Sequence, residues 1–147
     1  MIGIDIVCIA RIERVVDRFG YRGLSRFLLP SEISLCLKDS QNIRESFKNY
    51  SPLSLETIDL LQEHVSSKSI NISRVAGFWA AKEALSKALG VGIGCELGFF
   101  DMIISKDSRN APQINLTLEK QTYFGVHHIA LSISHDSGFA IAAVICS

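Results

Sequence analysis

The chain has 147 residues, 48% of them hydrophobic and 20% charged, which predicts a single globular domain over residues 1–147 and excludes a disordered chain. Its formal net charge is zero, so we expect neither nucleic acid nor a membrane surface as a partner. No apolar run reaches the roughly 18 residues of a membrane span, and the N-terminus lacks a signal-peptide layout, so a cytoplasmic protein is expected.

The first predicted element is a strand over residues 2–7, where isoleucines alternate with other residues and a valine follows. Asp5 interrupts this strand, and a carboxylate inside a buried apolar strand is costly without a partner. Two interpretations stay open. Asp5 lies at an edge or a hydrogen-bonded strand end, or it is a metal-binding or catalytic carboxylate.

Residues 9–19 have apolar side chains at helical spacing and predict an amphipathic helix. Arginines recur along its other face every three or four residues: Arg11, Arg14, Arg18, Arg22 and Arg26. We expect Gly20 and Gly23 to interrupt the helix, which leaves the first three arginines on one face. That face is either solvated, with Glu13 and Asp17 as local partners, or a docking surface for an acidic partner.

A short helix is expected from Ser31, as its N-cap, to about Lys38. Residues 39–72 are the least organised part of the chain and are rich in serine and asparagine. Within them, Ser54 is a suitable N-cap for a further helix over about 55–66. The four cysteines are scattered without a Cys-x-x-Cys motif, so we expect small core residues and neither a zinc site nor a disulfide framework.

The stretch 73–94 predicts a long helix with a glycine-rich exit. Alanines recur every fourth residue and form a ridge of small side chains that lets another element approach closely: Ala76, Ala80, Ala84 and Ala88. Four polar residues fall within one arc of about 140°: Lys82, Glu83, Ser86 and Lys87. Gly90 ends the helix, and Gly92 and Gly94 leave the next backbone bare. The helix is therefore a candidate site with one carboxylate and one or two amines.

The remainder of the chain predicts mainly strands. We expect strands over 99–105 and 113–118 around a turn at 107–110, then a turn or two of helix over 119–125. Strands over 128–134 and 139–145 are expected to form a hairpin, with His135 in its turn. A Ser134–His135–Asp136 triad is rejected because adjacent residues on a tight turn cannot adopt that geometry.

The carboxylates of Asp5 and Glu83, alongside the amine of Lys87, suit a hard divalent cation that is shared with substrate phosphates. Magnesium usually takes one or two protein carboxylates and fills its remaining positions with water and phosphate oxygens. The glycines at 90, 92 and 94 would allow backbone N–H groups to approach a phosphate, although such a string is a weak signal alone.

Three motifs together resemble holo-[acyl-carrier-protein] synthase, the short, trimeric class of 4′-phosphopantetheinyl transferases. They are Gly-Ile-Asp-Ile-Val with Ala-Arg-Ile-Glu at 3–13, Phe-Trp-Ala-Ala-Lys-Glu-Ala-Leu-Ser-Lys-Ala-Leu-Gly-Val-Gly-Ile-Gly at 78–94, and Ser-Ile-Ser-His at 132–135. The resemblance implies an α+β fold in which a long central helix packs on a small, mainly antiparallel sheet. Residues 39–72, with the extra helix predicted within them, are longer than usual in this family.

The resemblance implies that 4′-phosphopantetheine is transferred from coenzyme A to a serine of apo-acyl carrier protein, as fatty acid biosynthesis requires, with release of adenosine 3′,5′-bisphosphate. Asp5 and Glu83 match the magnesium ligands, with manganese as an alternative metal, and Glu83 and Lys87 match catalytic positions. Positions that bind coenzyme A are Lys87, Gly90, Gly92, Gly94 and His135. Carrier docking is implied for Arg11 and, along the same face, Arg14 and Arg18. The family's sites lie between the subunits of a homotrimer.

Two features of the chain leave questions open. Members of the family often have an arginine where this chain has Phe78, and Arg74, one turn earlier, is a candidate replacement. The general base is either a metal-bound water or Glu83 itself. The alternative function is a non-catalytic coenzyme A-binding or regulatory trimer, and the metal carboxylates argue against it. The broad-specificity transferases resemble two such units in one chain, whereas this chain has one set of motifs.

Overall fold

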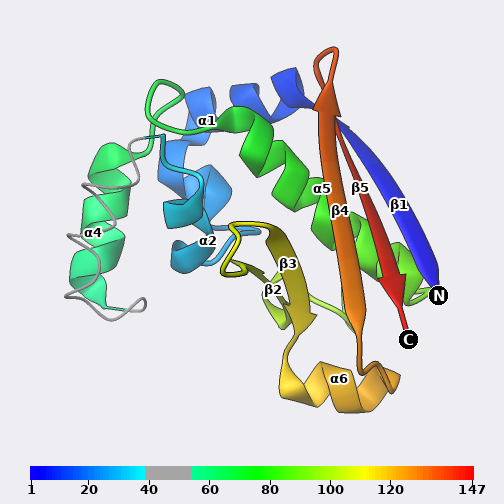
Figure 1. Cartoon of the computed structure of the whole chain (residues 1–147). Helices are drawn as coiled ribbons and strands as arrows, with labels where there is room; N and C mark the ends of the chain where they lie inside the picture. The colour runs from blue at the N-terminus through cyan, green and yellow to red at the C-terminus, as the bar shows by residue number, and fades with distance from the viewer. Residues whose placement is uncertain (39–53) are drawn as a thin grey trace.

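A computed structural model describes residues 1–38 and 54–147 and confirms the expected α+β class (Figure 1). Three antiparallel strands form the main sheet in the order β1-β5-β4, with β1 at one edge. The long helix α5 lies across one face of this sheet. The bounds of these elements are β1 Ile2–Cys8, α5 Ile72–Ala88, β4 Ile129–Asp136 and β5 Phe139–Cys146.

Helix α5 is the predicted central helix, and its alanine ridge packs on β1 and β5. Asn71 caps its start, where Oδ1 accepts a hydrogen bond from the Arg74 N–H at 3.0 Å. The four ridge alanines are buried. Gly3 is the matching feature in β1, because a Cβ there would lie 2.0 Å from the Ala84 carbonyl oxygen. Only glycine allows β1 to lie this close to the helix, so strand and ridge fit together.

Helix α1 (Ile9–Leu24) begins immediately after β1, with no intervening residue. Its apolar face is buried through Ile12 and Val16. Gly20 has φ 51° and ψ −136°, which breaks the helix at the first of the two predicted interruptions, whereas Gly23 stays helical. The arginines at 11, 14 and 18 therefore precede the kink, whereas those at 22 and 26 follow it.

Helix α2 (Pro30–Leu35) starts at a different cap from the one expected. Its N-cap is Leu29, not Ser31, because the Glu32 carboxylate reaches back and accepts a hydrogen bond from the Leu29 N–H at 2.7 Å. The helix also ends three residues before Lys38. Pro30 occupies the first turn, where its missing N–H costs nothing.

Helix α4 (Leu55–His64) confirms the helix predicted after Ser54, whose Oγ accepts from the Thr57 N–H at 3.2 Å. It packs against α1 and α2, at the end of the molecule distant from the main sheet (Figure 1). The first part of the predicted irregular segment, residues 39–53, lies outside the described residues. None of the described helices is long and apolar enough to cross a membrane.

A second, two-stranded sheet follows α5 and is formed by β2 (Met102–Lys106) and β3 (Pro112–Leu116). The first of these strands starts later than predicted, because Phe99–Asp101 forms a 3-10 turn, η1. Asp107 closes the predicted turn, with Oδ1 accepting from the N–H groups of residues 109 and 111. The short helix α6 (Leu118–Phe124) then leads to β4.

The β4–β5 hairpin differs from the prediction in one respect that matters for the site. Pairing continues to Asp136 opposite Phe139, so the loop is only Ser137 and Gly138. His135 therefore lies within β4, opposite Ala140, and not in the turn. The left-handed conformations of both loop residues fit a tight two-residue hairpin.

The face of the main sheet that points away from α5 is apolar and exposed. Five isoleucines on β1 and β5 form this outer face, with exposed fractions of 42–66%: Ile2, Ile4, Ile6, Ile141 and Ile145. The cysteines meet the expectation only in part. All four are free, and two are buried as expected (Cys36 and Cys146), but two are exposed (Cys8 and Cys95).

Candidate active site

Asp5 lies on the side of β1 that faces α5 and forms an ion pair with Lys87. Its Oδ1 atom is 2.7 Å from the Lys87 Nζ, and the Asp5 side chain is only 14% exposed. In the sheet Asp5 is opposite Ala142, which is buried beneath the helix. The close contact at Gly3, two residues earlier, brings the carboxylate to α5. Asp5 thus occupies an edge strand and has a charged partner on the central helix.

Glu83 precedes Lys87 by one helical turn and completes the carboxylate site, the name used here for Asp5, Glu83 and Lys87. Burial raises the pKa of the Glu83 carboxyl, and the nearby negative charge of Asp5 raises it further. The positive charges of Lys87 and Arg11 oppose this shift. The hydrogen bond to Asp5 raises the pKa of Lys87 in turn. The two carboxylates are therefore close enough to repel each other.

A divalent cation fits this pair of carboxylates. Their mutual repulsion would be relieved by a cation between them, and carboxylate oxygens are the ligands that Mg²⁺ prefers. Among residues 1–38 and 54–147, no group of three or more His, Cys, Asp or Glu side chains is placed to hold a metal. Two protein ligands would leave most coordination positions for water and phosphate oxygens, as is usual for magnesium bound with a phosphate substrate.

The glycine-rich exit of α5 offers fewer free N–H groups than its sequence indicates. Gly90 has φ 74° and ends the helix, with its N–H donating to the Lys87 carbonyl at 3.1 Å. The Gly94 N–H donates to the Leu97 carbonyl at 2.9 Å. In the described structure Gly92 donates no such bond. A Cβ at any of the three glycines would meet nothing within 4 Å, so the segment is open to a ligand.

His135 lies on the other flank of α5 from the carboxylate site. Its ring approaches the helix at Gly77, where a Cβ would come within 2.9 Å of the His135 Nε2. It lines a hollow of about 200 Å³ between α5, β4 and the β2–β3 hairpin, together with Arg74, Phe78, Lys106, Asn110, Pro112 and Ile133. One chain therefore does not gather all the predicted site residues in one place.

Phe78, where a family arginine is often found, lines this His135 hollow, and so does Arg74 one turn earlier. The Arg74 guanidinium donates to the Leu35 carbonyl at 2.6 Å, which fixes its position at the hollow. Both residues were predicted from the sequence. Lys106 and Asn110 were not, because no local motif marks them and the β2–β3 hairpin brings them to the same hollow.

The predicted docking arginines at 11, 14 and 18 are exposed on α1. The Arg11 guanidinium lies 5.8 Å from the centre of the Trp79 ring, a cation–π contact. Beside it is a largely apolar groove of about 300 Å³, called here the docking groove, which is lined by Arg11, Ile12, Val15, Phe19, Gly23, Arg26, Phe27, Trp79 and Phe99. The kink in α1 brings Arg26 to this groove as well.

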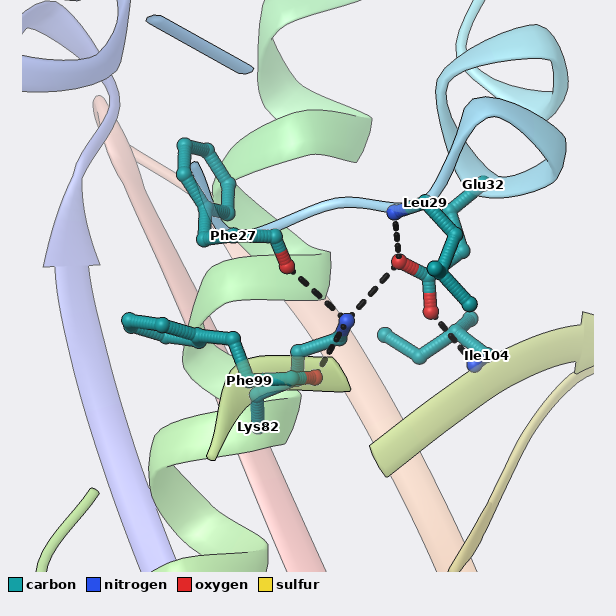
Figure 2. A network of polar contacts seen from close by, with 6 residues as sticks. All are labelled: Phe27, Leu29, Glu32, Lys82, Phe99 and Ile104. Carbon is teal, nitrogen blue, oxygen red and sulfur yellow. Dashed lines mark hydrogen bonds and ion pairs between the residues drawn. The ribbon is translucent and has the colours of Figure 1, made fainter. Parts of the chain in front are cut away.

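Lys82 belongs to the predicted polar arc but does not reach the carboxylate site, so of the arc's two lysines only Lys87 lies at that site. The Lys82 side chain is fully buried and pairs with the buried Glu32, with Nζ 2.8 Å from Oε2 (Figure 2). The Nζ also donates to the carbonyls of Phe27 at 2.9 Å and Phe99 at 3.0 Å. Ser86, expected in the same arc, is buried too.

Both carboxylate oxygens of Glu32 also have hydrogen-bond donors. Besides the Leu29 N–H, it accepts a hydrogen bond through Oε1 from the Ile104 N–H of β2 at 2.7 Å. Figure 2 shows how the network draws together α2, α5, η1 and β2. A weak sequence signal was available, because position 82 lies one turn after the apolar Phe78 and so falls on a buried face.

Comparison with known proteins shows the family to which the chain belongs. The family model of the 4′-phosphopantetheinyl transferase superfamily matches residues 1–144. A holo-[acyl-carrier-protein] synthase of Helicobacter acinonychis is 48% identical over 147 residues, with 100% of both chains covered. One of Nitratiruptor is 41% identical over 145 residues and covers 99% of this chain and 97% of its own.

Solved structures agree with the sequence relatives. The crystal structure of Helicobacter pylori holo-[acyl-carrier-protein] synthase in complex with coenzyme A has 46% identity and a TM-score of 0.73, with 100% of both chains covered. That of the Neisseria meningitidis synthase has 25% identity and a TM-score of 0.67, and covers 99% of this chain and 96% of its own. The chain therefore belongs to the holo-[acyl-carrier-protein] synthase family of the 4′-phosphopantetheinyl transferase superfamily.

Proposed function

We propose that the protein transfers 4′-phosphopantetheine from coenzyme A to a serine hydroxyl of apo-acyl carrier protein, in the cytoplasm and in the service of fatty acid biosynthesis. Family membership supports the reaction class. The observation that carries the proposal is the carboxylate site, where Asp5 and Glu83 repel each other beside the Lys87 ammonium. Such a site suits a magnesium ion and a pyrophosphate.

In this reaction the serine oxygen forms a bond to the phosphorus that carries the pantetheine arm. The bond from that phosphorus to the bridging oxygen of the pyrophosphate breaks, and adenosine 3′,5′-bisphosphate leaves. Magnesium or manganese held by Asp5 and Glu83 would supply positive charge to the pyrophosphate. Half of the Lys87 side chain is exposed, so a bound phosphate could reach its ammonium. In this proposal the ammonium offsets charge on the leaving phosphate. Glu83 is the carboxylate of the site that would accept the serine proton.

Coenzyme A is held, in this proposal, by Lys87, the glycines 90, 92 and 94, and His135. The open backbone after α5 supports close approach of a phosphate, and the Gly92 N–H is the donor available for it. In the His135 hollow, Arg74 takes the place of the arginine that Phe78 replaces. Its fixed guanidinium suits bidentate phosphate binding.

The carrier protein docks on α1 through Arg11, Arg14 and Arg18. These exposed cations complement an acidic helix, and the adjoining docking groove accepts apolar side chains between Arg11 and Arg26. Arg11 is also close enough to Glu83 to affect its pKa. A carrier seated here would present its serine near the carboxylate site.

Two features of the single chain support assembly into a homotrimer. The carboxylate site and the His135 hollow lie on opposite flanks of α5, so one chain alone does not surround a coenzyme A. The five isoleucines of the outer face give each chain an apolar surface that water would otherwise cover. Packing through this surface would allow the carboxylate site of one chain to meet the His135 hollow of another.

The test is conversion of purified apo-carrier protein to its holo form with coenzyme A and magnesium, read as the mass gain of one phosphopantetheine group. Glu83→Ala should abolish conversion with the fold intact by circular dichroism, and an active variant would contradict the role of Glu83. Binding of coenzyme A without conversion by the wild type would favour the alternative, a non-catalytic binding or regulatory trimer.

A further inference from the structure

The ion pair between Lys82 and Glu32 is the one fully buried salt bridge among the described residues, and the reaction proposed above does not use it. All three hydrogens of the Lys82 ammonium have acceptors, and both Glu32 oxygens accept backbone N–H groups. Replacing such a pair with apolar residues of similar volume is often neutral or stabilising. Net stability is therefore a weak explanation for it.

Geometry gives the pair a more specific role. An ammonium that donates to three acceptors holds all of them in fixed positions, and two of these acceptors are the carbonyls of Phe27 and Phe99. These residues lie far apart in the sequence, yet both of their rings line the docking groove. Figure 2 shows the two rings on the same side of the Lys82 nitrogen.

The aromatic wall of the groove also includes Trp79 of α5. The ring of Phe27 lies 4.8 Å from that of Trp79, and the ring of Phe99 lies 5.2 Å from it, measured between centroids. Trp79 carries the Arg11 guanidinium on its face. Trp79 and Lys82 share one helical turn, so the ammonium ties the two loop phenylalanines to the helix that bears their aromatic partner.

The same turn of α5 continues directly into Glu83 of the carboxylate site. Lys82 points toward α2 and β2. The charge of Asp5 on β1 raises the pKa of its neighbour, Glu83. We propose that Lys82 is a positioning residue: with Glu32 it fixes the aromatic wall of the docking groove relative to Glu83, so that a docked carrier presents its serine at the carboxylate site. This inference rests on the proposed function.

The experiment uses the double variant Lys82→Met/Glu32→Met, which removes both charges at similar volume. Carrier KM is expected to rise at least about tenfold, since misplacement of a docking surface by about 1 Å has effects of this order. Binding of coenzyme A should change less than twofold. The chain has a single tryptophan, so acrylamide quenching of Trp79 fluorescence should increase as the wall loosens. Lys68→Met, at an exposed position, is the charge-loss control and should match wild type.

If the double variant fails to fold, Glu32→Gln replaces it, because an amide oxygen still accepts one of the two N–H groups. A rise in carrier KM with increased quenching is expected there too. A folded variant with unchanged carrier KM would overturn the inference, as would equal losses of carrier and coenzyme A affinity. A wild type that modifies no carrier would instead refute the proposed function, and the quenching comparison would still decide whether the pair fixes the wall.

Discussion

Replacing Gly3 with alanine is expected to damage both the stability and the activity of the protein. The added Cβ would lie 2.0 Å from the Ala84 carbonyl oxygen and 2.5 Å from the Ala88 nitrogen, both backbone atoms that cannot rotate away. Relief to an ordinary contact of 3.4 Å requires β1 to move about 1.4 Å from the helix. Overpacking of this kind costs about 1–3 kcal/mol, and we expect the upper end because backbone must shift.

The same shift would carry Asp5 away from Lys87, because Asp5 lies on the strand that moves whereas Lys87 lies on the helix. The 2.7 Å contact between Asp5 Oδ1 and Lys87 Nζ would then exceed hydrogen-bond range. Urea unfolding at one fixed protein concentration measures the loss of stability, which is read as a lower midpoint with an unchanged slope. Conversion of apo-carrier protein measures the loss of activity, for which we expect about a hundredfold.

Gly98→Ala is the matched control for this substitution. Gly98 has φ −86°, which alanine adopts freely, and its added Cβ would be 3.5 Å from the Asp101 Oδ2, an ordinary contact. This variant should stay within about 0.5 kcal/mol of the wild type, or gain slightly from reduced freedom of the unfolded chain. If Gly3→Ala unfolded at the same urea concentration as Gly98→Ala, the close packing of β1 on the alanine ridge would be refuted.

Three further predictions concern charges at the site. Arg11→Glu should raise the KM for carrier about tenfold at low salt and much less at 1 M salt. Lys68→Glu is the control. An equal rise in the KM for coenzyme A would contradict the docking role of Arg11. Arg74→Gln should raise the KM for coenzyme A about tenfold and leave that for carrier unchanged, so a change in carrier KM alone would exclude Arg74 as the phosphate ligand. In metal-free protein, Glu83→Gln should raise the free energy of unfolding at pH 8, because the raised pKa means that folding disfavours the ionised carboxylate. This gain in stability should fade as the pH falls from the raised pKa to the ordinary pKa of a glutamate. Urea titrations in which the gain grew as the pH fell would contradict the raised pKa.

Local patterns in the sequence predicted much of the fold. The alanine repeat located α5 and its packed face, because spacing along a helix alone decides which side chains share a face. The cap at Ser54 and the break at Gly20 were equally readable, since each depends on the chemistry of a few adjacent residues. For the same reason Asp5 stood out as a carboxylate within an apolar strand.

What the sequence could not predict depends on contacts between distant segments. Lys82 was grouped with Glu83 and Lys87 in one polar arc because its partner, Glu32, lies fifty positions earlier and the pairing is tertiary. The cap of α2 is a local exception, misplaced because the Glu32 side chain caps Leu29 two residues before the expected Ser31. His135 was assigned to a turn because the length of strand pairing in a hairpin is set by register, which the apolar pattern leaves undefined by a residue or two.

The direct passage from β1 into α1 limits how this protein can be rebuilt. Asp5 and Arg11 are separated by six positions on a continuous strand and helix with no loop between them. A chimera that exchanged α1 alone to change carrier preference would also alter the position of Asp5. The smallest transplantable unit is therefore residues 1–19 together, which end before the break at Gly20. Under the proposed function, carrier recognition and the chemistry cannot be exchanged separately in this chain.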